Sequence, residues 1–540
     1  MRVSLKSIAG LAFATYLSGC STLKNLPPEQ AEPQQPQDPM VALQKKADAA
    51  KAQGKMVAIT GNKKGFVAVD PITGITQDEL NSYAYWSSNF TNAAFAASQM
   101  HVTRPNMRAI LQHYSSTRFL TNLDENKDYT DEEIKDLVNA QTSEMIESLD
   151  AHSNYFLPKE REDFLNGMNG IRHMIGITFE AHDQGIIIRQ VTEGSAAEAA
   201  GIKVNDIIHG DGARNFKGMS ADDVRSYLSD PEKFSFKITR SGEALAQDIE
   251  VTKADVKLNA VRSSIIDNQT AYFKIFSFAN DVHLQFKEQF EAVQAKGGDT
   301  LNGVVIDLRG NSGGSMQAVA ELADYFIKDD NKLFEIARIQ FGQEGGGAYI
   351  SEPDNELTDL PVTVLINNFS ASASEIFAGV LQDYGRATIV GDGPSHGKAN
   401  GQAIMHFNSP DGTTPSLKLT NMLIYLPKSG SYQQIGIQPD ILVPMDTKYK
   451  AFLNQDGMIP RESDHKNALR NPQGKTAPKP STYKCSATGD EALLSVFRMK
   501  TQDVKEADIS HDSVMLCAID NLNHTSRYSI TIKNILAPQS

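Results

Sequence analysis

A cluster of serines, followed by a lysine, has the residue types and spacing that acyl-transfer chemistry requires. The segment 368–375 (NFSASASE) lies where a predicted buried strand passes into a predicted helix. A serine at such a corner is exposed, and the amides and dipole of the following helix can hold an oxyanion. Ser372 is therefore a candidate nucleophile. The spacing of Ser372 and Glu375 also fits a capping box, in which Ser372 is only a helix cap.

The candidate base is Lys398, which stands in the segment 397–402 (GKANGQ). Glycine on its N-terminal side is unusual for a lysine on a solvated surface. Burial beside Ser372 would lower the pKa of this amine toward neutral pH and let the amine accept the serine proton. Gln402, on the same side of an extended strand, could orient the amine. The alternative is an ordinary surface lysine in a loop.

Two glycines could supply backbone donors near the serine. Gly313 and Gly314 follow a predicted strand at 303–306. Glycine allows the backbone to approach a neighbour closely and to present its N–H groups. The simpler interpretation is a tight turn.

The surrounding pattern predicts a parallel sheet that positions these residues. Short apolar runs at 303–306 and 362–366 are typical of buried parallel strands. Helical stretches are predicted at 316–327 and 375–384, the second ended by a glycine, and a further strand follows at 387–390. We expect a βαβα arrangement.

Two other regions precede this one. Residues 76–163 have apolar residues at helical spacing, with helix starts predicted at Thr76 and Thr130, each followed by Glu at the third position. From 174 to 252 the pattern changes to strands at 185–188, 234–238 and 248–251, with one short helix opened by Ser220. This region of about 85 residues is interpreted as a small binding module.

The N-terminus carries an export signal. Arg2 and Lys6 precede an apolar run, and the ending Leu17-Ser18-Gly19-Cys20 resembles a bacterial lipobox, in which Cys20 carries the lipid. The alternative is a plain signal peptide with a chance cysteine. Residues 21–60, rich first in Pro and Gln, favour a tether. No later apolar run is long enough for a transmembrane helix.

Charge and cysteine content set further bounds. Acidic residues number 66 and basic residues 52, for a net charge of −14, which disfavours general affinity for nucleic acid or anionic membrane.

Three cysteines are present, and an exported compartment permits a disulfide between Cys485 and Cys517. Two free thiols are the alternative.

Several motifs in order resemble the carboxy-terminal-processing, or tail-specific, serine protease family. They are 149–155 (LDAHSNY), 174–252 with 194–202 (GSAAEAAGI), 307–314 (DLRGNSGG), 370–375, 397–398 and 436–440 (GIQPD). The resemblance implies a multidomain α/β fold: a ClpP/crotonase-like β-α protease core, an inserted PDZ domain and a helical N-terminal segment. The expected parts are a signal peptide (1–19), tether (20–75), helical domain (76–165), PDZ domain (170–255), protease core (256–450) and C-terminal segment (451–540).

The resemblance also implies roles. By position, Ser372 is the nucleophile, Lys398 the general base and Gln402 its support, and the amides of Gly314 and Ala373 form the oxyanion hole. Such Ser-Lys pairs are a known variant of the Ser-His-Asp catalytic triad. No cofactor or metal is expected.

In the family the PDZ module takes up a substrate's free C-terminus. Ile175, Gly176 and Ile177 would form the carboxylate-binding loop, with the peptide added as a strand. The expected partners are proteins or peptides with free, apolar C-termini, an envelope adaptor, and the membrane through acylated Cys20. Ser21 after the cysteine favours the outer membrane, facing the periplasm.

Some positions depart from the family pattern. The loop 391–398 is about one residue longer than usual, His396 replaces a usual aromatic residue, and Ala399 replaces a usual glycine. His396 raises a Ser-His alternative to the Ser-Lys pair. The altered loop keeps open a catalytically weak or inactive, lipid-anchored PDZ scaffold, and a structural envelope lipoprotein is a third hypothesis.

Overall fold

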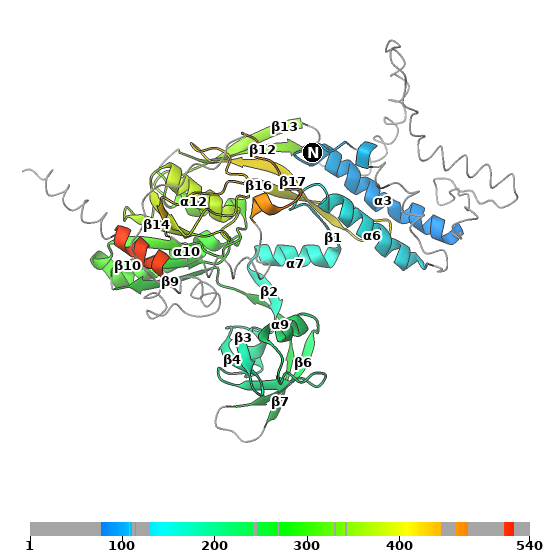
Figure 1. Cartoon of the computed structure of the whole chain (residues 1–540), viewed down its shortest axis with the longest axis horizontal. Helices are drawn as coiled ribbons and strands as arrows, with labels where there is room; N and C mark the ends of the chain where they lie inside the picture. The colour runs from blue at the N-terminus through cyan, green and yellow to red at the C-terminus, as the bar shows by residue number, and fades with distance from the viewer. Residues whose placement is uncertain are drawn as a thin grey trace, which may run out of the picture. The chain divides into compact units, whose positions relative to one another are not determined.

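The computed structural model describes ten ranges of the chain, drawn in colour in Figure 1: residues 77–106, 108–110, 114, 129–240, 246–267, 269–328, 331–340, 343–443, 461–473 and 512–522. The predicted signal peptide and tether, with Cys20, lie outside these ranges, as do Thr76 and Cys485. Within the described ranges, no helix combines the length and apolar character needed to cross a membrane.

The predicted parallel sheet is present and has six strands. Their order is β18-β15-β14-β11-β10-β9, and all neighbours are parallel except β9 against β10. The strands are β9 (Val261–Ile266), β10 (Thr270–Ile275), β11 (Gly303–Asp307), β14 (Val362–Ile366), β15 (Ala387–Gly391) and β18 (Ile441–Leu442). The three runs predicted as strands form β11, β14 and β15.

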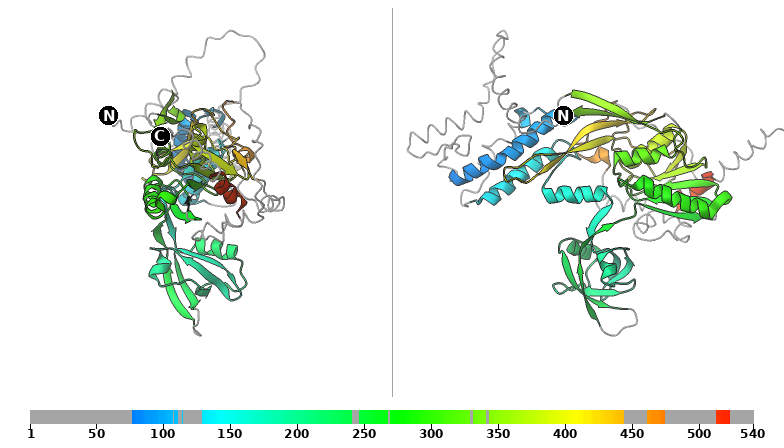
Figure 2. Two further views of the ribbon diagram at one scale, coloured as in Figure 1. Left: turned by 90° about the vertical axis from the view of Figure 1, so that its left-hand side faces the viewer. Right: turned by 180° about the vertical axis from the view of Figure 1, so that it is seen from behind.

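Helices cover both faces of this sheet. Three of them, α10 (Val282–Gly297), α11 (Met316–Asp324) and α12 (Ala373–Asp383), share one apolar core with one face of the strands. A helix at 513–522 contributes to the core on the opposite face. This helix (red) faces the viewer in Figure 1, whereas α10 faces the viewer in the right-hand view of Figure 2. Both faces are buried, as expected for parallel strands.

Helix α11 is shorter than predicted. The sequence predicts a helix to residue 327, but α11 ends at Asp324. The next three residues, Tyr325, Phe326 and Ile327, remain buried in the same core. Their apolar side chains extend the helical pattern beyond the helix itself. The C-cap of α12 agrees with prediction, since Gly385 has φ +67°.

A second, antiparallel sheet lies beside the core and was not predicted. Its path is β1-β17-β12-β13, and β16 also pairs with β17. These strands are β1 (Asn154–Phe156), β12 (Lys332–Gln340), β13 (Gln343–Ile350), β16 (Asn400–His406) and β17 (Ser416–Tyr425). Strand β13 is glycine-rich and exposed, which hides it from an apolar pattern.

The N-terminal region is helical, as expected. It contains α3 (Gln77–Met100), α6 (Asp131–Glu147) and α7 (Pro158–Met168). The predicted capping box at Thr130 is confirmed: its hydroxyl accepts from the Glu133 amide at 3.3 Å, and its amide donates to the Glu133 carboxylate at 2.9 Å.

The binding module is a five-stranded antiparallel sheet in the order β3-β4-β5-β6-β7, and a two-stranded ladder, β2 with β8, flanks it in the chain. The strands are β2 (Ile171–Met174), β3 (Ile177–His182), β4 (Gly185–Val191), β5 (Ile207–Gly210), β6 (Lys233–Thr239), β7 (Gln247–Thr252) and β8 (Ala254–Lys257). The predicted helix is α9 (Ala221–Ser229), but the prediction of one helix was wrong. A second, α8 (Ala196–Ala199), has a single turn capped by Ser195, which is too short to show a helical period.

Candidate active site

Ser372 stands at the corner between β14 and α12 in a strained conformation. Its φ and ψ are +56° and −114°, a region that residues other than glycine rarely adopt. Its hydroxyl makes no helix-capping hydrogen bond. The Ser372 amide does donate to the Glu375 carboxylate at 2.8 Å, which is one half of the predicted capping box, but a capping role alone does not require this conformation. Strain of this kind typically occurs at functional sites, where the surrounding structure enforces it.

Glu375 provides part of that enforcement. One carboxylate oxygen accepts from the amides of Ser372 and Lys398, both at 2.8 Å. The other accepts from the Ser395 hydroxyl and the Gly397 amide, both at 2.6 Å. The side chain is fully buried, and this burial raises its pKa. One carboxylate thus ties the serine corner to the loop that carries the lysine.

Lys398 is held in place by two hydrogen-bond acceptors. Its Nζ donates to the Asn400 carbonyl at 3.0 Å and to Gln402 Oε1 at 3.1 Å. Burial lowers the pKa of Lys398 to about 8, although the nearby Glu462 carboxylate opposes the shift. A neutral amine has two hydrogens and one lone pair. Two fixed acceptors take the hydrogens and leave the lone pair to accept a proton.

A chain of hydrogen bonds fixes Gln402. Its Nε2 donates to Thr420 Oγ1 at 3.0 Å, and Thr420 donates to Asp150 at 2.8 Å. Asp150 also bonds the ring of His101, just after α3, at 2.7 Å. Burial alone would raise the pKa of Asp150, but bonds from His101 and Ser153 hold it at about 2. Gln402 Oε1 therefore faces the amine, with its orientation set from two other elements.

The glycine turn lies against the serine. Gly313 has φ +104°, and a Cβ placed there would lie 2.8 Å from both the Ala371 carbonyl and Ser372 Cβ. The Gly313 carbonyl and the Ser315 amide both hydrogen-bond to the backbone of Phe278. The amide of Gly314, which lies between them, therefore points away from Phe278. The Ala373 amide begins α12 and has no intrahelical acceptor. These two amides are the available oxyanion donors.

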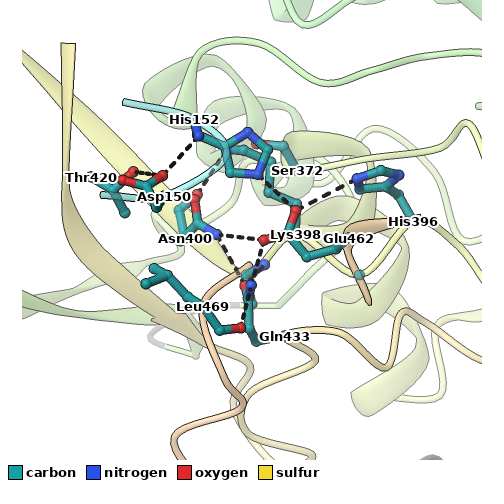
Figure 3. Close-up of polar contacts among 12 residues, drawn as sticks. Asp150, His152, Ser372, His396, Lys398, Asn400, Thr420, Gln433, Glu462 and Leu469 are labelled. Carbon is teal, nitrogen blue, oxygen red and sulfur yellow. Dashed lines mark hydrogen bonds and ion pairs between the residues drawn. The ribbon is translucent and has the colours of Figure 1, made fainter. Parts of the chain in front are cut away.

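His152 and Glu462 form a pair that sequence reasoning missed, shown with Lys398 and Ser372 in Figure 3. His152 Nε2 lies 2.7 Å from Glu462 Oε2. Burial lowers the pKa of His152, and the Lys398 charge lowers it further. Only the position of His152 in the motif 149–155 hinted at a role. Glu462 lies in a polar segment without a recognisable motif.

Among the described residues, no hydrogen bond joins the Ser372 hydroxyl to the His396 ring or to the Lys398 amine. His396 Nε2 faces Glu462 Oε2 at 3.6 Å, and the His396 amide donates to the Ser370 carbonyl at 3.0 Å. The residue is buried. The His396 ring therefore faces the segment at 461–473.

The predicted carboxylate-binding loop leads into an edge strand. Ile175 is buried, Gly176 has φ +89°, and Ile177 begins β3, whose partner in the sheet is β4. The Ile175 carbonyl accepts from Ala197 at 2.9 Å, and the Gly176 carbonyl accepts from Thr192 at 2.8 Å, which fix the turn. The free edge of β3 is a surface to which a peptide strand can add.

Cys517, in the helix at 513–522, is disulfide-bonded. Its expected partner, Cys485, lies outside the described residues. The helix is also held by an ion pair, because the Arg309 guanidinium makes a bidentate contact with Asp512 at 3.0 and 2.7 Å.

Comparisons with known proteins agree with this architecture. Residues 269–443 match the Peptidase family S41, and residues 165–239 match the PDZ domain family. The chain is 31% identical over 314 residues to a carboxy-terminal-processing protease of Bartonella bacilliformis, covering 57% of this chain and 70% of that protein. It is 28% identical over 331 residues to a CtpA-like serine protease of Staphylococcus aureus, covering 61% of this chain and 64% of the relative.

The comparison with solved structures also finds two proteases. The photosystem II D1 C-terminal processing protease has a TM-score of 0.40 and 20% identity, covering 68% of this chain and 94% of that chain. The tricorn protease has a TM-score of 0.40 and 14% identity, covering 71% of this chain and 36% of that chain. The identity and coverage of the Bartonella relative, with the family match over the core, show that this chain belongs to the carboxy-terminal-processing proteases, serine peptidases of family S41 that carry a PDZ domain.

Proposed function

We propose that this protein is an endopeptidase that cleaves exported proteins near apolar C-termini with a Ser372–Lys398 dyad. The observation that carries this proposal is the state of the amine. Lys398 is desolvated, its pKa is lowered to about 8, and its two acceptors leave one lone pair for the serine proton.

The reaction proceeds in two acyl transfers. Lys398 accepts the proton of Ser372 as the hydroxyl oxygen attacks the scissile carbonyl, and the amides of Gly314 and Ala373 stabilise the oxyanion. The protonated amine then gives its proton to the leaving peptide nitrogen as the C–N bond breaks. Water, deprotonated by the same amine, hydrolyses the ester on Ser372. Gln402 keeps the amine in place through both steps.

Substrate recognition is assigned to the PDZ domain. A free C-terminal carboxylate would bind the amides of the turn at Ile175, Gly176 and Ile177, and the preceding residues would add to the edge of β3. The apolar side chains of Phe179 on β3 and Val224 on α9 both belong to the domain core near this edge. An apolar terminal residue fits such surroundings.

The proposed location is the bacterial cell envelope. The N-terminal segment resembles a lipoprotein signal peptide, which supports anchoring through an acylated Cys20, and Ser21 favours the outer membrane. An envelope adaptor protein remains a candidate partner. Mass spectrometry of the protein from a bacterial membrane fraction should find a mature N-terminus at Cys20 with two or three acyl chains. An unmodified cysteine there would contradict the anchor.

Cleavage of a protein substrate with an apolar C-terminus tests the function. Ser372→Ala and Lys398→Ala should each abolish cleavage of the full substrate while circular dichroism remains unchanged. Amidation of the substrate's C-terminus should weaken binding to the PDZ domain. The two variants should still fail to cleave the amidated substrate. Full activity of either variant would refute the dyad. A wild-type chain that binds the substrate tail without cleaving it would instead support the lipid-anchored scaffold.

A further inference from the structure

Three side chains, one of them in the loop of Lys398, take no direct part in the proposed reaction. His396, Glu462 and His465 each offer a ligand atom, and these atoms all lie within 4.8 Å of one another. His396 and Glu462 are buried and His465 is half-buried. His396 is also the residue that departs from the usual aromatic at this position of the family. A ligand bound by the imidazole would explain this departure.

The cluster is held in place by its surroundings. Glu462 Oε1 accepts from Gln433 Nε2 at 2.6 Å, and Oε2 lies 2.7 Å from His152 Nε2 and 3.6 Å from His396 Nε2. The Glu462 amide donates to the His396 carbonyl at 3.2 Å, so the two segments are also joined through the backbone. Outer hydrogen bonds of this kind orient metal ligands and are part of most metal sites.

His465 completes the cluster from the far side. Its ring lies 6.3 Å from that of His396 and 6.2 Å from that of His152, measured between ring centroids. In the described part of the chain, no hydrogen bond engages its imidazole. A half-buried imidazole without a hydrogen bond, facing a buried carboxylate and a second imidazole, has a nitrogen available for a ligand.

We propose that His396, Glu462 and His465 bind one zinc ion. Two imidazoles and a carboxylate are a ligand set that zinc prefers, with the fourth tetrahedral position left for water. Calcium and magnesium favour all-oxygen sites and are excluded by the two nitrogens. His396 belongs to the loop of Lys398, and the other two ligands belong to 461–473. The ion would therefore fasten this segment to the active-site loop.

Zinc titration of the full chain, without a polyhistidine tag and stripped with a chelator, tests the proposal. Calorimetry should show one tight site, and the melting temperature should rise as the site fills, because a ligand that binds only the folded state stabilises it. His465→Ala should weaken zinc binding at least 100-fold and abolish this rise. The matched control is His182→Ala, on β3, which should bind as the wild type does.

Two further measurements keep the proposal open to refutation. Cobalt(II) in place of zinc should give the intense visible bands of tetrahedral coordination, and His396→Ala should remove them. If wild type binds no zinc at 100 μM free metal, the proposal is wrong. It is equally wrong if His465→Ala and His396→Ala both bind zinc with wild-type affinity, since the metal would then lie elsewhere. Neither outcome depends on peptidase activity.

Discussion

Replacement of Glu375 by glutamine should uncouple the nucleophile from its base. The carboxylate accepts four hydrogen bonds: one oxygen serves the amides of Ser372 and Lys398, and the other serves the Ser395 hydroxyl and the Gly397 amide. Glutamine keeps one oxygen and replaces the other with an NH₂ group. If the NH₂ group faces Ser372 and Lys398, both of their amides lose an acceptor; if it faces the other side, the Gly397 amide loses its acceptor, whereas the Ser395 hydroxyl can turn and accept.

The expected loss follows from the less costly orientation, which leaves at least one donor unsatisfied. A buried donor left without an acceptor costs about 1–3 kcal/mol. Relief from burying a charge offsets part of this cost, because burial raises the pKa of Glu375 and so disfavours its ionised form. We expect a net loss of about 1 kcal/mol or more in the free energy of unfolding. Catalysis should fall on the order of 100-fold, as for small misplacements of reacting groups.

Urea unfolding and the rate of labelling by a fluorophosphonate serine probe measure the two effects. Glu335→Gln is the matched control, because this carboxylate is 51% exposed and pairs only with surface Lys332 among the described residues. It should change stability by less than about 0.5 kcal/mol. The reasoning fails if Glu375→Gln matches the control in both stability and labelling rate.

Three further predictions concern the base, the glycine turn and the C-terminal helix. Because Lys398 works as a neutral amine and its pKa is about 8, kcat/KM should rise with pH and reach half its plateau near pH 8. About a tenth of the plateau value should remain at pH 7. A flat profile from pH 6 to 9 would contradict this. Gly313→Ala places a Cβ 2.8 Å from Ser372 Cβ at an unfavourable φ. Probe labelling should therefore fall about 100-fold, with a loss of about 1–3 kcal/mol in the free energy of unfolding. Normal labelling would show that the turn does not support the serine. Asp512→Ala leaves the buried Arg309 with one carboxylate partner fewer and should cost about 3 kcal/mol in urea unfolding, whereas an unchanged midpoint would mean that the helix at 513–522 is not held by this pair.

The parallel core could be predicted from sequence because its signals are local. Buried parallel strands appear as short apolar runs, and helix boundaries are marked by caps, as at Gly385. The serine, lysine and glutamine of the proposed site all lie beside predicted strands. Their order along the chain, with the family resemblance, was enough to propose roles.

The second sheet and much of the site could not be predicted, because a strand of the sheet lacks an apolar pattern and the site joins residues that are distant in sequence. Strand β13 is polar and glycine-rich and owes its form to pairing with β12. Glu462 lies in a segment with no periodic pattern, and its place beside His152 depends on tertiary packing. The same holds for Asp150, which supports Gln402 through Thr420 on β17. Glu375 fits a capping box in sequence, but its carboxylate bonds reach the loop of Lys398.

The central claim is that an uncharged Lys398 makes Ser372 reactive. Peptide mapping by mass spectrometry after timed exposure to a fluorophosphonate tests it most directly, with wild type, Lys398→Ala and His152→Ala compared at pH 8.5. We predict that wild type is labelled at Ser372, that His152→Ala is still labelled there, and that Lys398→Ala loses at least 99% of the rate, about the effect of removing a general base. Labelling of Lys398→Ala at the wild-type rate, with loss in His152→Ala, would contradict the account and assign the base to the imidazole.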